Sequence, residues 1–515
     1  MLLNMREKIH KTTPSNGIHN PTEWLALILI LVFSVVIRLP FIHVPMTDDE
    51  GAYAYTTYFW LQGDTLYDEL WMDRPQGIFL LYALIFKCMG HSTEAIRLFS
   101  AVYNAGSVLF VYLIVHFLFS RKTGLLAAFI FAFFSTSVYI EGFTANAELF
   151  MTLPSLVSIY FLLLAEGRRE NLFLFLSGLF SGIALLVKPS GGTTLFLGLS
   201  FITYLHFKTT PKPGGKNLLA RLLLLGIGFT VAFLPSLIHG MYIGIDKYLE
   251  AVLLFRLRKK SLFSVEIWHQ LLRFTRSLFF FLRGNSFLLL SALWGLVLLK
   301  ISGKKREVWF IALWVFCALL GMAMGGKWWY HYYVQVIPPL AILSSYGLSR
   351  LLPLLMNKRL SSYVTLAVLC AFLYSDCINS YRFFFAYTPV EASWRLYHRR
   401  GYLVAVPISS YLRRHTHSGD RIYVAHGEAE FYYLARRRSA LKYLFVSELI
   451  LIPQAYDRLI ETLKDPRRAP KYIVYLKKQW PGVQKTGRLS LEEILRTYYY
   501  IETFIAGVPL YRRRL

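Results

Sequence analysis

Acidic residues are scarce in this chain of 515 residues, which has 30 Asp and Glu against 56 Lys and Arg. Charged residues of both signs make up only 17% of the sequence, whereas hydrophobic residues make up 55%. Soluble domains usually carry about 25% charged residues, and their apolar share is lower. The shortage of charge therefore excludes an ordinary soluble domain and predicts a protein with several membrane spans.

Cysteine is also rare, with Cys88, Cys317, Cys370 and Cys377 all in apolar segments and no CxxC pair. This pattern excludes a disulfide framework and predicts small apolar packing residues. The net charge of +26 would suit a nucleic-acid partner, but no nucleic-acid-binding module is recognisable. We expect the basic residues to face anionic lipid and to set the membrane topology, and we expect no nucleic-acid partner.

Apolar runs dominate residues 1–380. They lie at 24–42, 76–90, 94–119, 124–140, 147–165, 171–187, 193–207, 218–240, 276–299, 307–325, 333–355 and 361–380. Only helices satisfy their backbone polar groups as separate spans in lipid, so these runs predict a mostly α-helical chain with about 11–13 transmembrane helices. The run at 76–90 is short, and it either re-enters the membrane or returns through a tight turn.

Short basic loops between the runs predict the topology. These loops are Arg121-Lys122, Arg168-Arg169, Lys208 to Lys216, Lys300 to Arg306 and Lys358-Arg359. The positive-inside rule places them in the cytoplasm. No cleavage site follows the first run, so we expect an uncleaved first span with its N-terminus in the cytoplasm.

Residues 381–515 differ from the rest, because they are rich in charge and tyrosine. Short β-like runs occur at Asp420–Ala425, Lys471–Lys477 and Ile501–Tyr511. We predict a small extracytoplasmic α/β domain over 381–515, after a transmembrane domain over 1–380 whose first outer loop is 43–75.

Three consecutive acids, Asp48, Asp49 and Glu50, follow the first apolar run in the stretch VPMTDDEGAYAYTTY. The segment after them is amphipathic and is expected to lie flat on the membrane surface. One interpretation is a helix N-cap, which needs only one of the three acids. The other is a carboxylate that faces a concave site, where it can act as general base on an acceptor hydroxyl.

Cations and hydroxyls on the same predicted side of the membrane complement these acids. Arg74 and the segment 327–333, KWWYHYY, both lie there. Arginine suits bidentate phosphate binding. The alternatives are snorkelling of Arg74 to lipid headgroups and an ordinary aromatic belt at the interface.

Several motifs together resemble glycosyltransferase family 39, which has the GT-C fold and includes protein O-mannosyltransferases and the bacterial aminoarabinose transferase of lipid A. The motifs are Asp49-Glu50-Gly51 with Tyr53, Gly63, Tyr67-Asp68, Asp73-Arg74-Pro75-Gln76-Gly77, Arg97-Leu98-Phe99-Ser100 with Asn104, Asn146-Ala147-Glu148, Leu186-Val187-Lys188-Pro189, His331-Tyr332-Tyr333-Val334-Gln335 with Pro338-Pro339, and Gly419 to Val424. The chain departs from the pattern at Arg74, where the family has lysine, and at Gln76, where it has a second proline.

The resemblance implies an integral membrane glycosyltransferase that uses a sugar linked to a polyprenyl phosphate and inverts the anomeric carbon. The acceptor would be lipopolysaccharide or lipid A, another cell-envelope glycan, or a protein, and the membrane a bacterial inner membrane. Asp49 and Glu50 would be the catalytic carboxylates. The other implied site residues are Arg74, Lys327, His331, Tyr332 and Tyr333 at the donor phosphate, with Asp48, Tyr53, Asp73, Asn146, Glu148 and Arg38 in support.

Two points stay open in the sequence. Glu50, Asp73 and Glu148 are candidate oxygen ligands for a divalent cation, with hydrogen bonding to loop backbone as the alternative. Arg38 either faces the site or snorkels.

A transporter or flippase of lipid-linked sugar is the alternative function. The largely uncharged spans and the missing internal repeats speak against it. A non-catalytic surface scaffold would explain the charged tail but not the three consecutive acids.

Overall fold

Long apolar helices build most of the chain. The computed structural model describes residues 21–167, 169–208, 214–258, 267–356, 360–425, 428–476 and 491–514. The long helices are α2 (Pro21–Val36), α5 (Thr93–Leu118), α6 (Arg121–Phe134), α7 (Ala147–Leu164), α8 (Glu170–Val187), α9 (Thr193–Lys208), α10 (Gly215–Ile243), α13 (Ile267–Ile301), α14 (Lys305–Ala323), α15 (Ile337–Met356) and α16 (Leu360–Phe385). Each predicted apolar run corresponds to one of these or to the short helix α4 (Gly77–Met89).

Eight helices in the described residues are long and apolar enough to cross a membrane. The predicted class, a mostly α-helical integral membrane protein, is confirmed. The helices α4, α6 and α9, with 13, 14 and 16 residues, and also α15 are outside this group of eight. The predicted number of about 11–13 spans therefore stays a prediction.

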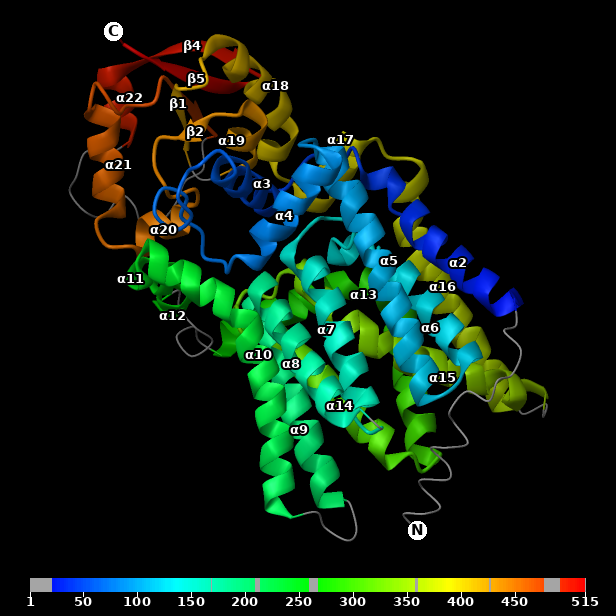
Figure 1. Cartoon of the computed structure of the whole chain (residues 1–515). Helices are drawn as coiled ribbons and strands as arrows, with labels where there is room; N and C mark the ends of the chain where they lie inside the picture. The colour runs from blue at the N-terminus through cyan, green and yellow to red at the C-terminus, as the bar shows by residue number, and fades with distance from the viewer. Residues whose placement is uncertain are drawn as a thin grey trace.

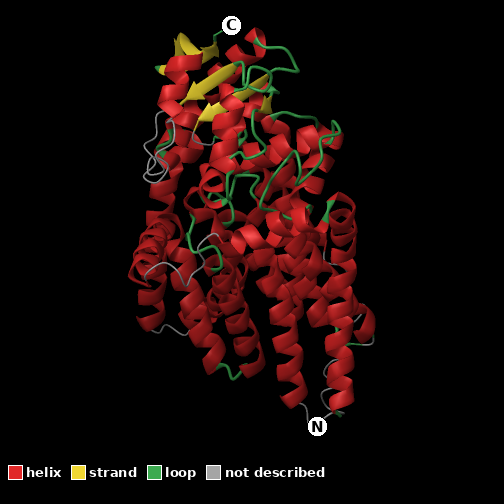
Figure 2. Cartoon of the chain, turned by 90° about the vertical axis from the view of Figure 1, so that its left-hand side faces the viewer, coloured by secondary structure: helices red, strands yellow, loops and turns green. Residues whose placement is uncertain are grey.

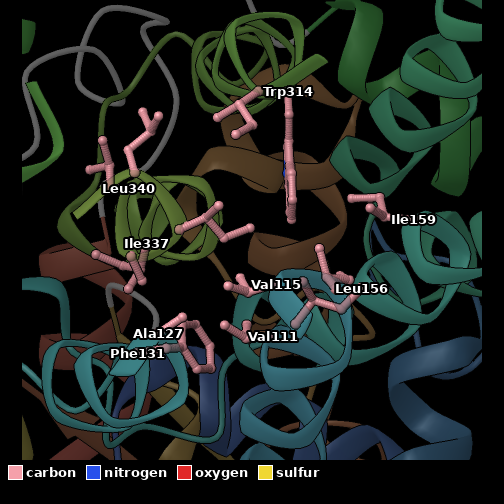
Figure 3. Packing of buried hydrophobic residues seen from close by; sticks show 14 of the residues in the cluster. Val111, Val115, Ala127, Phe131, Leu156, Ile159, Trp314, Ile337 and Leu340 are labelled. Atoms are coloured by element: carbon pink, nitrogen blue, oxygen red, sulfur yellow. The ribbon is translucent and has the colours of Figure 1, made fainter. Parts of the chain in front are cut away.

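The helical bundle is held together by apolar side chains. Figure 3 shows side chains from five helices that converge on one core. They include Val111 and Val115 of α5, Phe131 of α6, Leu156 of α7 and Trp314 of α14. In lipid, helices with such side chains associate mainly through close van der Waals packing and interhelical hydrogen bonds.

Short elements connect the long helices near the end of the bundle that carries the sheet. They are η1 (Leu39–Phe41), α3 (Asp48–Trp60), η2 (Val138–Ile140), η3 (Pro189–Gly192), α11 (Ile245–Leu249), the π-helical turn η4 (Glu250–Leu254), α12 (Phe255–Arg258) and η5 (Tyr330–Val336).

The helix α3 corrects one expectation. The predicted amphipathic helix is present, but it is buried between α4 and α19 (Glu430–Ala435) instead of lying on a surface. A Cβ atom on Gly51 would lie only 2.4 Å from Cα of Glu430, so glycine is needed for this close approach.

The C-terminal part contains a five-stranded sheet in the order β2-β1-β3-β5-β4. Its strands are β1 (Arg421–Ala425), β2 (Arg438–Ser439), β3 (Tyr472–Tyr475), β4 (Tyr499–Ile505) and β5 (Val508–Arg513). The pairs β1–β2 and β1–β3 are parallel, with Ile422 opposite Tyr472, whereas β5 is antiparallel to both of its neighbours. The accompanying helices are α17 (Pro389–Tyr397), α18 (Arg400–His415), α19, α20 (Val446–Leu451), α21 (Ala455–Lys464) and α22 (Leu491–Tyr498).

The structure changes two predicted boundaries. The single strand expected at 501–511 is a hairpin, because Ala506 and Gly507 both take positive φ values of 48° and 71° and reverse the chain. The domain boundary predicted at residue 380 falls inside α16, which continues to Phe385.

Figures 1 and 2 both place the sheet at one end of the helical bundle. The end of α9 and the start of α10 lie at the opposite end (Figure 1), as expected for a basic loop on the other side of the membrane from the tail. The predicted sides themselves stay a prediction. Residues 1–20, Arg168, 209–213, Lys358-Arg359 and Lys477, on which some topology and strand predictions rest, lie outside the described residues.

Candidate active site

The three consecutive acids occupy the first turn of α3. Thr47 is the N-cap: its hydroxyl accepts a hydrogen bond from the Glu50 amide, and Glu50 accepts one from the Thr47 amide. Asp48, Asp49 and Glu50 follow, where the partial positive charge of a helix N-terminus favours anions. Because successive residues of an α-helix point about 100° apart, the three carboxylates reach three different environments.

Glu50 is enclosed in a buried ion pair. Its two oxygens accept from Arg97 Nε at 2.5 Å and Arg97 Nη2 at 2.7 Å, and also from the Ala145 amide at 2.7 Å and from Thr47. The Glu50 and Arg97 side chains are 0% and 1% exposed. These bonds leave no carboxylate oxygen of Glu50 facing a cavity, so the structure corrects the catalytic role predicted for it.

Asp48 also has partners, but nearer the surface. Its oxygens accept from Arg399 Nη1 and from the Tyr402 hydroxyl, each at 2.7 Å. Burial alone would raise the pKa of Asp48, but Arg399 and Tyr402 hold it below its usual range. Asp48 therefore joins α3 to the segment between α17 and α18 as a permanent anion.

Asp49 differs from both neighbours. It is half-buried, and in the described part of the chain its carboxylate oxygens take part in no hydrogen bond or ion pair. Burial and the charge of Asp48 raise the pKa of the Asp49 carboxyl, against the opposing effects of Arg74, His331 and Lys188. A half-exposed carboxyl with a raised pKa and cations nearby fits a general base.

Arg74 is the first of three cations around Asp49. Arg74 Nη1 donates to Asp73 Oδ1 at 2.6 Å, and its Nε donates to the Tyr53 hydroxyl at 3.3 Å. The Tyr67 hydroxyl donates to the Arg74 carbonyl at 2.7 Å, which fixes the loop before α4. The predicted residues Tyr53, Asp73 and Arg74 are thus brought together.

Arg256, the second residue of α12, is the second cation. Its Nε and Nη2 donate to the Asp73 carbonyl at 2.9 and 2.6 Å, and its Nη2 lies 3.6 Å from Asp73 Oδ2. Sequence reasoning missed this residue. The segment 241–275 is predicted to lie outside, yet it carries the basic stretch FRLRKK. This departs from the positive-inside rule and could have drawn attention to Arg256.

Lys188, in the turn between α8 and η3, is the third cation. Its ammonium pairs with Glu148 Oε1 and lies 4.0 Å from the centre of the Tyr332 ring. Burial lowers the pKa of Lys188 well below its usual range, and the charges of Arg74 and Arg256 lower it further. The sequence motif from Leu186 to Pro189 includes Lys188, but the sequence alone predicted no role for this residue.

A polar chain continues from Glu148 to His331 and Glu141. His331 Nε2 lies 3.6 Å from Glu148 Oε1, and His331 Nδ1 lies 3.1 Å from Glu141 Oε2. Tyr332 stands near Arg74 and Asp49, and burial raises the pKa of its hydroxyl to about 12. The structure thus places His331, Tyr332 and Glu148 near one another and near Asp49.

Other predicted residues lie elsewhere. Lys327 is exposed, with its ammonium 6.0 Å from the centre of the Trp329 ring. Tyr333 is buried in the helical core, where its ring stacks on Phe281 at 4.7 Å. The phosphate-binding roles of Lys327 and Tyr333 stay predictions, and the two rings that they contact lie outside the Asp49 cluster.

The two remaining supporting residues are buried away from the three cations. Arg38 does not snorkel: it donates to the Ser34 carbonyl at 2.9 Å and to Ser135 Oγ at 2.9 Å, and so ties α2 to the end of α6. Asn146 is the N-cap residue of α7 and makes no side-chain capping bond.

The candidate metal ligands do not form one site. Glu50 pairs with Arg97, Asp73 with Arg74, and Glu148 with Lys188. Within the described ranges, no group of three or more His, Cys, Asp or Glu side chains is placed to hold a metal ion. The predicted ligand set of Glu50, Asp73 and Glu148 is therefore corrected, since each of these carboxylates has its own cationic partner.

Known proteins resemble this chain in part of its sequence and in its fold. Residues 73–239 match the family described as dolichyl-phosphate-mannose-protein mannosyltransferase, a range that includes Arg74, Glu148 and Lys188 but not Asp49. No curated protein matches the chain significantly. Among solved structures, ArnT from Cupriavidus metallidurans in the apo state aligns with a TM-score of 0.63 and 13% identity over 95% of this chain and 98% of ArnT. The chain has the GT-C fold.

Two further GT-C structures are similar. ArnT bound to undecaprenyl phosphate aligns with a TM-score of 0.59 and 12% identity over 95% of this chain and 98% of that one. The oligosaccharyltransferase AglB from Archaeoglobus fulgidus, in complex with an inhibitory peptide and a dolichol-phosphate, aligns with a TM-score of 0.56 and 13% identity over 88% of this chain and 69% of that one. The resemblance indicated by the sequence motifs is confirmed, and the chain is similar to membrane glycosyltransferases with lipid-linked donors.

Proposed function

We propose that this chain is a membrane glycosyltransferase that moves a sugar from a polyprenyl-phosphate donor to an acceptor outside the cytoplasm. The observation that carries the proposal is the unpaired carboxylate of Asp49 near Arg74 and Lys188, with Arg256 close to both of these cations. An acid and a cation cluster at one point match a reaction that takes a proton from a hydroxyl and releases a phosphate. The likeness to ArnT bound to undecaprenyl phosphate also favours a polyprenyl carrier.

The proposed reaction is a single displacement. The acceptor hydroxyl oxygen attacks the anomeric carbon, the bond from that carbon to the phosphate oxygen breaks, and Asp49 takes the hydroxyl proton. The configuration inverts, and the polyprenyl phosphate leaves with an additional negative charge. Arg74 and Arg256 stabilise this charge through guanidinium N–H groups, and Lys188 and Tyr332 lie near both arginines.

The acceptor class stays open in this proposal. A lipopolysaccharide or lipid A, another envelope glycan or a protein would each present a hydroxyl to Asp49. If the acceptor atom is a phosphate oxygen, no base is needed, and Asp49 only orients the acceptor. The proposed location is a bacterial inner membrane with the site on its outer face.

The test is transfer by purified protein reconstituted in vesicles, together with mass spectrometry of the glycolipids and glycoproteins of cells. Asp49→Asn should lower transfer by about 100-fold to 10,000-fold, because a positioned general base contributes that much. The matched control is Asp246→Asn, which changes an exposed acid on α11 and should leave transfer unchanged.

Two outcomes would contradict the proposal. Full transfer by a folded Asp49→Asn protein would remove the role of Asp49. Movement of the lipid-linked sugar across vesicles without any glycosylated product would favour the flippase.

A further inference from the structure

A charged cavity lies between the first outer loop and the C-terminal sheet, apart from the Asp49 cluster. Its volume is about 310 Å³. Tyr55 and Asp64 belong to the wall formed by α3 and the outer loop, whereas Arg421 and Arg458 belong to the wall formed by β1 and α21. Pockets of roughly this size and larger accommodate small polar molecules.

Two of the three acids of the outer-loop wall are paired with cations, and the third, Glu69, keeps its negative charge. Asp64 accepts both guanidinium bonds of Arg438, at 2.7 and 2.8 Å. Asp68 accepts from Lys247 at 2.7 Å. Glu69 accepts from the Thr65 amide at 2.8 Å.

Three cations of the lining are left without an acid. Within the described ranges, Arg421, Lys442 and Arg458 form no ion pair, and Arg421 donates only to the Ser439 carbonyl at 3.0 Å. Glu461 is the one lining carboxylate that makes no hydrogen bond or ion pair in the same ranges. The interior of the cavity is therefore positive on balance and suits an anion.

The lysine among these cations is crowded by like charges. Burial lowers the pKa of the Lys442 amine, and Arg458 and Lys247 lower it further, against the opposite effect of Asp68. An anion beside Lys442 and Arg458 would relieve this repulsion, since each cation would then have an opposite charge nearby.

Aromatic residues link the cavity to the candidate active site. The lining residue Tyr443 contacts Trp71 edge-on, with ring centres 5.7 Å apart, and Trp71 contacts Phe255 at 4.7 Å. Phe255 directly precedes Arg256 in the sequence. Tyr55 lies on the same helix as Asp49, about 9 Å further along its axis at 1.5 Å per residue. The cavity therefore lies close to the candidate active site, with one layer of buried aromatic side chains between them.

We propose that this cavity binds an anionic saccharide unit of the acceptor, a sugar that carries a phosphate or carboxylate, next to the site of transfer. Arg421, Lys442 and Arg458 bind the anion, and the rings of Tyr55 and Tyr443 contact the sugar. The inference rests on the proposed glycosyltransferase function and narrows its acceptor to an acidic glycan.

The experiment is calorimetric titration of the purified full-length protein with mannose 6-phosphate, mannose and inorganic phosphate. Lys442→Gln with Arg458→Gln should weaken mannose 6-phosphate binding by about tenfold or more, because two charge-assisted hydrogen bonds are lost. The matched control is Arg413→Gln with Arg414→Gln, two exposed cations of α18 outside the cavity, and it should bind like the unchanged protein. A Lys442→Arg variant keeps the charge and should keep binding.

A donor-site variant separates this inference from the proposed function. Arg74→Gln with Arg256→Gln should lose transfer but still bind mannose 6-phosphate. If the unchanged protein binds mannose 6-phosphate but transfers no sugar, that result would count against the proposed function and not against the anion site. If the Arg74 and Arg256 variant loses binding while the Lys442 and Arg458 variant keeps it, the anion binds at the donor site and the inference is overturned. Absent binding, or inorganic phosphate binding as tightly as mannose 6-phosphate, would also overturn it.

Discussion

Asp49 and Glu50 are neighbours in one helical turn, yet they belong to regions of opposite character. The Glu50 region is closed: every oxygen of the carboxylate has a donor, and Arg97 is buried with it. The Asp49 region is open, with one unpaired carboxylate near a group of cations that pair with acids other than Asp49. A buried ion pair with no free oxygen stabilises the local structure, whereas a carboxylate without a partner is available to a substrate.

Apart from substitutions of Asp49 itself, the largest effect should come from breaking the buried ion pair of Glu50 and Arg97. Glu50→Gln leaves the Arg97 guanidinium buried without its counter-charge, and we expect the protein to lose about 3–5 kcal/mol of stability. Thermal unfolding in detergent measures this loss, and Asp49→Asn should leave the unfolding temperature nearly unchanged.

A double variant serves as the control for this stability loss. Glu50→Gln with Arg97→Gln removes both charges and should recover part of the lost stability. If Glu50→Gln instead unfolds like the native protein but loses transfer, Glu50 acts in the reaction and the two regions do not differ as described.

The next effect concerns the open region. Arg256→Gln removes a guanidinium beside Asp73, and we expect kcat/KM for the polyprenyl-phosphate sugar to fall by about 10-fold to 100-fold, the worth of one or two charge-assisted bonds. The matched control is Arg258→Gln, two residues further along α12, where the guanidinium pairs with Glu250 at 2.6 Å. An equal loss in both variants would mean that Arg256 only supports the local fold.

The smallest effect should appear in the pH dependence. The raised pKa of Asp49 means that its base form appears at a higher pH than for an ordinary aspartate, so kcat/KM should fall as the pH drops through that raised value. The charge of Asp48 contributes to the raised pKa of Asp49. Asp48→Asn should therefore shift the acidic limb of the pH–rate profile to lower pH, by about one unit or less.

The pH–rate profile of the two proteins measures the shift. Asp246→Asn is the control and should leave the limb in place, since its carboxylate is exposed on α11. A limb that stays fixed or moves to higher pH in Asp48→Asn would show that the titrating group is not Asp49.

Part of the site was predictable because it is local. The turn from Asp48 to Glu50 and the segment Asp73-Arg74 lie in one outer loop of the sequence, and a motif could find them. Arg256 and Lys188 could not be found in this way, because they are separated from Asp49 by long stretches and reach it only through the packing of α8 and α12 around the loop. Tyr332 and Tyr333 illustrate a further limit, since these adjacent residues of one motif have different surroundings once the turn η5 forms: Tyr332 lies near Asp49, whereas Tyr333 stacks on Phe281 in the core.

The sequence by itself determined that the chain is a helical membrane protein, where its helices run, and that acids and an arginine share an outer loop. It could do so because apolar runs of sufficient length have few alternatives to helices in lipid. Only the tertiary structure decided which acid is enclosed and which is open. That choice depends on the direction of each side chain and on partners such as Arg97, Arg256 and Arg399, which distant segments bring to the same turn.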